Sequence, residues 1–317
     1  MGDSEIPRGD AGGDARPVVR VVCGPTAAGK TYAAMLCARF ADVAVVSADS
    51  RQVYRGFDIG TAKPTVRDRL AAPHFGVDVL DPTERASAAW WAQAADGWIR
   101  EAQGQGRTPI VVGGTGLYLR ALFGELFDEP AMDPARRAAL QVELGGMSIG
   151  ALRRWTERLD PARAALGRTQ LLRAVEVALL TGRRVSELHR ERRTVPRWRA
   201  RYLVVDPGPR LAELIAERTG TMFSQGWPEE VRTLIETVPD DAPAWNASGY
   251  GAVRDMVQGR ISTDDARERV IIETRQYAKR QRTWFRHQLA GADVTRLDAQ
   301  AASFEQALRQ WWEGAAP

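Results

Sequence analysis

The sequence predicts an α/β protein, in which a P-loop parallel-sheet core is interrupted by a helical insertion domain. Three observations predict this fold. The string GPTAAGKT follows a mainly apolar, β-branched run near the N-terminus. Apolar runs then alternate with stretches of helical periodicity, which is typical of a parallel sheet covered by helices. Between residues 128 and 196 the periodicity is helical throughout, and no run there is typical of a strand.

The first elements frame a loop. Residues 1–17 lack the apolar stretch of a signal peptide and are predicted to form a flexible tail. Val18–Cys23 is rich in β-branched residues, which favours a buried parallel strand. Gly24–Gly29 is expected to turn the chain, and Lys30–Phe40 has the spacing of a helix.

Further strands are predicted at Val43–Asp49, Gly76–Asp81 and Pro109–Gly114. Between the last two, Ser87–Gln103 has helical spacing, an aromatic face and a serine at the N-cap position. This alternation indicates parallel strands, because a crossover helix is needed to join them.

The pattern of apolar and polar residues changes in the second half of the chain. The predicted insertion at residues 128–196 leaves and re-enters the core, a placement suited to a lid. The core is therefore expected to comprise residues 18–127 and 197–317. Its second part begins with a strand at Arg201–Pro207 and continues with helices at Leu211–Gln225, Pro228–Thr237, Thr263–His287 and the string FEQALRQWWE.

Composition narrows the class of protein. The chain has 317 residues and a formal net charge of +4, which favours an anionic partner without identifying one. No apolar run reaches the roughly 18 residues that span a bilayer, so no membrane segment is expected. Cys23 and Cys37 are expected to be reduced core residues of a cytoplasmic protein. No group of Cys and His has zinc spacing, so no structural metal is expected.

The phosphate-binding loop, Gly24-x-x-x-x-Gly29-Lys30-Thr31, is the first motif that carries chemistry. Its glycines let backbone N–H groups converge on phosphate oxygens, and the following helix adds the positive end of its dipole. Lys30 is expected to reach the terminal phosphates and the Thr31 hydroxyl to hold Mg²⁺. The loop alone does not say which polyphosphate binds.

Two charged residues have open roles at this stage. Asp49 ends a predicted strand beside the loop and is placed to take a proton, to bind magnesium or to cap a helix. Arg173 lies with Glu176 on an otherwise apolar helix of the insertion, either as a structural ion pair or as a cation aimed at a leaving phosphate. Spacing does not separate these alternatives.

The predicted helix Thr263–His287 has a cationic second half. Its acidic residues lie in the first two turns, and four cations then share one face: Arg275, Lys279, Arg282 and Arg286. A solvated basic face is the plain alternative. The helix is nevertheless predicted to contact a nucleic-acid backbone, with nearby aromatic residues for stacking.

These motifs together resemble the tRNA dimethylallyltransferases, also called tRNA isopentenyltransferases. The strings that match, in the order of the family, are GPTAAGKT, SADSRQVYRGFDIGTAKP, APH before DVLDP, VVGGTGLYLRAL, LLRAVEVALLTG and TRQYAKRQRTWFR. They span most of the chain, and the second string is far more specific than the loop.

The resemblance implies a donor, a metal ion and a base. The donor is dimethylallyl diphosphate rather than ATP, and its diphosphate is bound with Mg²⁺ by Gly24, Pro25, Thr26, Ala27, Ala28, Gly29, Lys30 and Thr31. Asp49 is the base at the matching position, because the exocyclic amine of adenosine is a poor nucleophile until it loses its proton. Thr115 lines the channel where the substrates meet, and Arg173 helps to stabilise the leaving diphosphate.

The resemblance also implies an RNA acceptor, namely the anticodon stem-loop of tRNA with its adenosine 3′ of the anticodon. Extrusion of that base from a single-stranded loop is cheap. The implied tRNA contacts are Asp49, Ser50, Arg51, Gln52, Thr115, Thr169, Gln170, Arg173, Arg275, Lys279, Arg282 and Arg286. A monomeric enzyme is expected.

The chain departs from the family in two places. Thr169 and Gln170 stand where many members have Gln-Arg, and Gly251 stands where Gly-Tyr-Arg is common. Both segments touch tRNA in the family, so the contacts and the tRNA preference are in question. The competing interpretations are a small-molecule P-loop kinase, an adenylate isopentenyltransferase and an RNA-binding module without catalysis.

Overall fold

The computed structural model of the chain describes residues 15–124, 132–191, 195–289 and 293–314. The chain forms two compact units, one of residues 1–123 with 197–317 and the other of residues 124–196. The first unit contains a six-stranded sheet in the order β3-β2-β4-β1-β5-β6, and its neighbouring strands pair in parallel. The strands are β1 (Val18–Cys23), β2 (Val43–Ser47), β3 (His74–Phe75), β4 (Thr108–Gly113), β5 (Arg199–Val205) and β6 (Val294–Leu297). The predicted parallel-sheet fold class is confirmed.

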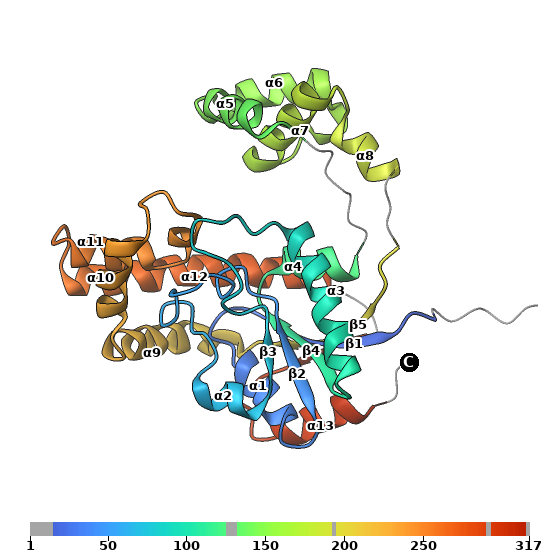
Figure 1. Cartoon of the computed structure of the whole chain (residues 1–317), viewed down its shortest axis with the longest axis vertical. Helices are drawn as coiled ribbons and strands as arrows, with labels where there is room; N and C mark the ends of the chain where they lie inside the picture. The colour runs from blue at the N-terminus through green and yellow to red at the C-terminus, as the bar shows by residue number, and fades with distance from the viewer. Residues whose placement is uncertain (1–14, 125–131, 192–194, 290–292, 315–317) are drawn as a thin grey trace, which may run out of the picture. The chain divides into compact units, whose positions relative to one another are not determined.

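Helices cover both faces of this sheet (Figure 1). Successive residues of a strand point to opposite faces, so Val22 of β1 packs into one core and Val21 into the other. The core around Val22 is closed by α1 (Lys30–Cys37) and α13 (Phe304–Glu313). The larger core around Val21 is closed by α3 (Ala88–Gly104), α4 (Gly116–Phe123), α9 (Leu211–Ser224), α10 (Trp227–Thr237), α11 (Tyr250–Val257) and α12 (Thr263–Gln288).

The predicted helix after Ser87 is present as α3, and its cap is the predicted one. The Ser87 side chain accepts a hydrogen bond from the Trp90 backbone N–H at 3.0 Å. Trp91 of α3 is fully buried, Trp90 and Trp98 are partly buried, and the Trp91 indole N–H donates to the Ser47 carbonyl at 3.0 Å. This bond fixes the end of β2, two residues before Asp49.

The predicted strand Gly76–Asp81 is wrong. The third strand is the two-residue β3, and beyond it Gly76 and Asp78 both have positive φ, 77° and 59°. Such angles cannot continue an extended strand. The Asp78 side chain forms ion pairs with Lys63 and Arg69, and these stabilise the bent conformation.

Several elements lie outside the predicted set. Strand β6 extends the sheet beyond β5, α2 (Val66–Ala71) has a Thr65 capping box, and α11 lies between the two predicted helices α10 and α12. Figure 1 shows α10 and α11 gathered at one end of the long α12. None of the described helices is both long enough and apolar enough to cross a membrane.

The second unit is helical in the part that the structure describes. Its helices are α5 (Pro134–Gly145), α6 (Ile149–Leu159), α7 (Arg168–Thr181) and α8 (Val185–Glu191). Leu144, Leu152, Leu171 and Val175 form a small core between the first three. The predicted start of the insertion, Asp128, and most of the predicted tail lie outside the described residues.

Candidate active site

The phosphate-binding loop lies between β1 and α1. A Cβ added to Gly24 would lie 2.1 Å from the Val205 carbonyl oxygen, so only glycine lets the loop pass this close to β5. Ala27 has φ of 62°, a strained conformation for alanine that is typical of ligand-binding loops. Among the described residues, the backbone N–H groups of Gly29, Lys30 and Thr31 have no acceptor. They are free donors at a helix N-terminus, an arrangement that binds anions.

Lys30 is a half-buried cation beside this loop. Its Nζ donates to the Pro25 carbonyl at 2.7 Å. Burial lowers the pKa of Lys30 from its ordinary value of 10.5 to about 8, against the opposing effect of the Asp49 carboxylate, and the charge of Arg218 lowers it further. The ammonium is therefore under-compensated, and an anion in the loop would stabilise its charged form.

A second cation at the loop is Arg218, which comes from α9. Its guanidinium donates to the Thr26 hydroxyl at 3.2 Å. Burial lowers the pKa of Arg218, and the Asp49 carboxylate again opposes the shift. Lys30 and Arg218 thus place two half-buried positive charges around the free N–H groups, so the loop favours a ligand with more than one negative charge.

Asp49 and Thr115 lie at the carboxyl ends of β2 and β4, which are neighbours in the sheet. One Asp49 carboxylate oxygen accepts from the Arg51 backbone N–H at 2.9 Å. The Thr115 hydroxyl accepts from the Ser50 N–H at 3.0 Å, and the Tyr277 phenol of α12 lies near it. Burial, with the Asp49 charge, raises the pKa of Tyr277 to about 12, so the phenol is neutral and can donate. One Asp49 oxygen therefore has a fixed position beside a cluster of hydroxyl groups.

Gln52 is engaged within the fold. Its side-chain oxygen accepts from the Ser47 hydroxyl at 3.0 Å, and its amide nitrogen donates to the carbonyls of Thr61 and Ala62 at 3.2 and 2.9 Å. The amide thereby ties the segment after Phe57 to the end of β2. The predicted contact of Gln52 with tRNA stays a prediction.

The same segment is anchored from its far side by two residues. The Lys63 side chain is 3% exposed, and its ammonium donates to the Tyr54 carbonyl at 2.5 Å and to Asp58 at 2.6 Å. Glu230 of α10 accepts from the Ile59 N–H and from the Tyr250 hydroxyl, both at 2.6 Å. The segment is therefore a fixed wall rather than a loose loop.

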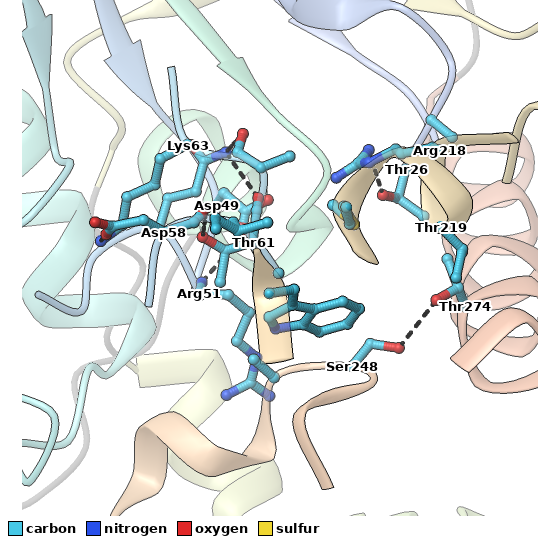
Figure 2. Close-up of a pocket in the computed structure, with 18 of the residues that line it drawn as sticks. Thr26, Asp49, Arg51, Asp58, Thr61, Lys63, Arg218, Thr219, Ser248 and Thr274 are labelled. Carbon is cyan, nitrogen blue, oxygen red and sulfur yellow. Dashed lines mark hydrogen bonds and ion pairs between the residues drawn. The ribbon is translucent and has the colours of Figure 1, made fainter. Parts of the chain in front are cut away.

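These elements enclose a cavity of about 1450 Å³. Figure 2 shows Thr26 and Arg218 on one side of it and Asp49, Arg51 and Thr61 on the other. The predicted site residues that line it are Thr26, Ala27, Ala28, Gly29, Lys30, Thr31, Asp49, Arg51 and Gln52. The cavity also has an apolar wall, formed by Ile59, Ile215, Met222, Trp227 and Val270. A single space therefore joins an anion site, a carboxylate and apolar surface.

The predicted cationic face of α12 does not line this cavity. Arg282 pairs with Asp206 and donates to Gly208, and Arg275 donates to the Ala212 carbonyl at 3.3 Å. Lys279 and Arg286 are exposed and have no partner among the described residues. The ion pair of Arg282 favours a structural role, whereas Lys279 and Arg286 are available for an anionic partner. Their contacts with RNA stay predictions.

The second unit carries Thr169, Gln170 and Arg173, all on α7. Thr169 and Gln170 are exposed, and the Gln170 side chain accepts from the Gly167 N–H at 3.1 Å. Arg173 is paired with Glu176, as the structural alternative required. Burial disfavours the Glu176 carboxylate, but hydrogen bonds from Arg137, Gln141 and Arg173 outweigh it and lower the pKa of Glu176. The role of Arg173 in transfer stays a prediction.

The residues around the loop fit a Mg²⁺ ion that would be bound mainly by the phosphates of a bound substrate and by few protein groups. Thr31 is exposed in the first turn of α1, and its hydroxyl has no partner in the described parts of the chain. The described residues contain no group of three or more His, Cys, Asp or Glu that could hold a metal ion alone. Mg²⁺ commonly keeps several waters and takes one or two protein ligands with substrate phosphates, as these residues would allow.

Sequence reasoning missed two polar residues that contact the phosphate-binding loop. Arg218 and Gln281 both contact Thr26, from 192 and 255 residues away in sequence. The periodicity of α12 contained a signal for Gln281, because it lies one turn after Tyr277 on a face other than the cationic one. Nothing in the local sequence of α9 distinguished Arg218 from other arginines.

Comparison with known proteins gives a consistent picture. The family model described as IPP transferase matches residues 52–288. A tRNA dimethylallyltransferase of Deinococcus radiodurans is 39% identical over 296 residues, covering 91% of this chain and 95% of that protein. One from Anaeromyxobacter sp. (strain K) is 42% identical, covering 84% of this chain and 89% of its own length.

Solved structures agree with these relatives. The tRNA isopentenylpyrophosphate transferase of Staphylococcus epidermidis is 28% identical with a TM-score of 0.65, covering 93% of this chain and 97% of that one. A eukaryotic dimethylallyltransferase acting on tRNA is 25% identical with a TM-score of 0.76, covering 94% of this chain and 76% of its own. The similarity therefore extends over both the core and the insertion.

Proposed function

Because the chain belongs to the tRNA dimethylallyltransferase (IPP transferase) family, we propose that it transfers the dimethylallyl group of dimethylallyl diphosphate to the N6 amine of the adenosine 3′ of the anticodon, position 37, in tRNA. Diphosphate is the second product. One observation carries the proposal: Asp49 lines the same cavity as the phosphate-binding loop. A base and an anion site across one space are what alkyl transfer from a diphosphate to an amine requires.

In the donor half of the site, the free N–H groups of Gly29, Lys30 and Thr31 bind the diphosphate. Lys30 turns from the Pro25 carbonyl to the phosphate oxygens, and Arg218 adds a second cation from α9. As the bond from the allylic carbon to oxygen breaks, negative charge grows on the diphosphate and these groups stabilise it. Mg²⁺, held by the phosphates and the Thr31 hydroxyl, would neutralise part of this charge.

In the acceptor half, the extruded adenine presents its N6 amine to Asp49. The new bond forms between N6 and the allylic carbon while the N6 proton passes to the carboxylate. One carboxylate oxygen is fixed by the Arg51 N–H, so the proton is taken by a group of defined position. Thr115 and Tyr277 supply hydroxyl groups beside it, and the apolar wall shelters the developing allylic cation from water.

The remainder of the RNA, beyond the extruded adenine, is bound by surfaces outside this cavity. Lys279 and Arg286 on α12 are the exposed cations proposed to contact its phosphates, together with the helical unit that carries Thr169, Gln170 and Arg173. Such contacts set position and affinity rather than base identity. The protein is proposed to act as a monomer on cytoplasmic tRNA.

The experiment that tests the proposal is nucleoside mass spectrometry of unmodified tRNA after incubation with the protein, Mg²⁺ and dimethylallyl diphosphate, without ATP. The expected result is a dimethylallyl adduct on adenosine, absent when the anticodon-adjacent adenosine is replaced by guanosine. Consumption of ATP with no adduct would favour a kinase. Prenylation of free AMP in preference to tRNA would favour an adenylate isopentenyltransferase.

A further inference from the structure

Helix α12 presents a second row of side chains to the loops that follow β1 and β4. Tyr277, Gln281 and Trp284 are spaced four and three residues apart, so they share one face of the helix. Tyr277 lies near the Thr115 hydroxyl, and Trp284 lies so close to Gly116 that an added Cβ there would meet its ring at 2.3 Å. Between them lies Gln281, which is 7% exposed.

The Gln281 amide joins the two loops directly. Its oxygen accepts from the Thr26 backbone N–H at 2.8 Å, and its nitrogen donates to the Gly114 carbonyl at 2.8 Å. The approach is close: a Cβ on Gly114 would lie 2.3 Å from the Gln281 nitrogen. One side chain thus spans the loop after β1 and the loop after β4, and no apolar residue could make either bond.

Each of these two hydrogen bonds of Gln281 lies next in sequence to a group that takes part in the proposed reaction. Thr26 precedes the free N–H groups of the phosphate-binding loop, and its hydroxyl accepts from Arg218. Gly114 precedes Thr115, which bonds the residue after Asp49. Because the Gln281 oxygen already accepts from the Thr26 N–H, that N–H cannot donate to a phosphate. Fewer backbone N–H groups of the loop are therefore available to bind the diphosphate than the sequence predicted.

We propose that Gln281 is a positioning residue, which sets the distance between the diphosphate site and the Asp49–Thr115 site. The inference rests on the proposed function. Attack on the allylic carbon needs the amine and the leaving oxygen on opposite sides of it, and a misplacement of about 1 Å can reduce the rate about 100-fold. The loop after β1 carries the diphosphate site, and the loop after β4 carries Thr115, whose hydroxyl holds the residue after Asp49. Gln281 holds one loop relative to the other.

The test compares Gln281→Met with wild type. Methionine has a similar length and removes both hydrogen bonds, so kcat should fall about 10- to 100-fold. The KM for tRNA should change less than twofold, because Gln281 is buried and its amide is engaged with the two loops. By calorimetry, inorganic diphosphate should bind more weakly but with unchanged stoichiometry. The matched control is Gln288→Met, the same change at an exposed position of the same helix, which should leave all three quantities unchanged.

A purely structural role would have a different signature. Partial unfolding of Gln281→Met would lower the binding stoichiometry for diphosphate in proportion to kcat, and this result would overturn the proposal. If the methionine variant does not fold, Gln281→Asn keeps a polar amide that is too short to span both loops. It should lose kcat with stoichiometry intact, whereas wild-type kcat in the asparagine variant would overturn the proposal. If wild type shows no transfer, the proposed function fails by itself, and the diphosphate affinity still tests the bridge.

Discussion

Two charged side chains that the fold shields from solvent, half-buried Lys30 in the first unit and buried Glu176 in the second, differ in how far their charge is compensated. Lys30 in the first unit has a pKa lowered to about 8, because burial outweighs the compensation from Asp49. Glu176 in the second unit is only 4% exposed, yet hydrogen bonds from Arg137, Gln141 and Arg173 hold its pKa below the ordinary value. The charge of Lys30 is therefore only partly compensated by the fold, whereas the charge of Glu176 is fully hydrogen-bonded.

The difference separates a binding site from a structural one. An under-compensated ammonium beside free N–H groups costs stability until an anion arrives, which is typical of a ligand site. A carboxylate with three donors lowers the cost of its own burial and links α5 to α7. The same contrast distinguishes the arginines: Arg218 faces the cavity, whereas Arg282 is committed to Asp206.

Removing the base should give the largest effect. Asp49→Asn keeps the size of the side chain but cannot accept the N6 proton, so transfer should fall about 10²- to 10⁴-fold. Binding of tRNA and of diphosphate should stay close to wild type, as measured by titration. Asp42→Asn, the same change at the exposed start of β2, is the control. An Asp49 variant with full transfer activity would show that another group is the base.

Breaking the completed cluster should cost stability and leave donor binding intact. Glu176→Ala removes a buried carboxylate from Arg137 and Arg173, which are partly exposed, so the loss of these charge-assisted hydrogen bonds should cost about 1–3 kcal/mol. The loss should appear in urea unfolding, while the Kd for inorganic diphosphate is unchanged. Glu187→Ala breaks a more exposed pair with Arg184 and should cost at most about 1 kcal/mol. Equal losses for the two variants would show that the Glu176 cluster stabilises the fold no more than an exposed ion pair does.

The sequence was informative where the signal was local. Strands β1, β2, β4 and β5 were predicted from apolar runs, and α3 from its periodicity and serine cap. The alternating string GVDVLD failed as a strand because Lys63 and Arg69 hold Asp78 at positive φ, and no local pattern contains those contacts. Arg218 was missed for the same reason, since its partner Thr26 is distant in sequence and only the fold brings them together.

The pH dependence of diphosphate binding tests the first charge. With a folded-state pKa of about 8, Lys30 loses its proton above that pH, and a bound anion must restore it. Affinity for diphosphate should therefore fall by up to about tenfold per pH unit above pH 8. Lys30→Arg stays charged, so the ratio of its diphosphate affinity to that of wild type should rise between pH 8 and pH 10. Titration of the diphosphate affects both proteins equally and therefore cancels in this ratio. A constant ratio would mean that Lys30 does not titrate in this range.

Stability should respond to the same residue with a defined sign. Between pH 8 and the ordinary value of 10.5, the unfolded chain holds more protons at Lys30 than the folded one. The contribution of Lys30 to the free energy of unfolding is therefore unfavourable below pH 8 and is relieved as the pH rises through this window. Lys30→Met should accordingly be at least as stable as wild type at pH 7, although it binds diphosphate poorly. A large loss of stability would instead give Lys30 a structural role like that of Glu176.

The smallest expected effect concerns a cavity position at which the fold requires no glycine. Gly251 lies in the first turn of α11 with an ordinary helical φ, and a Cβ added there would meet nothing within 4 Å. Gly251→Ala should therefore raise the free energy of unfolding by about 0.5–1 kcal/mol through helix propensity alone. Diphosphate binding should not change, because Gly251 lies on α11, whereas the proposed diphosphate site is formed by the loop after β1 and by Arg218 of α9. If Gly251→Ala is instead neutral in stability but weakens tRNA binding, then the space above Gly251 is occupied by RNA, and the glycine serves the acceptor rather than the fold.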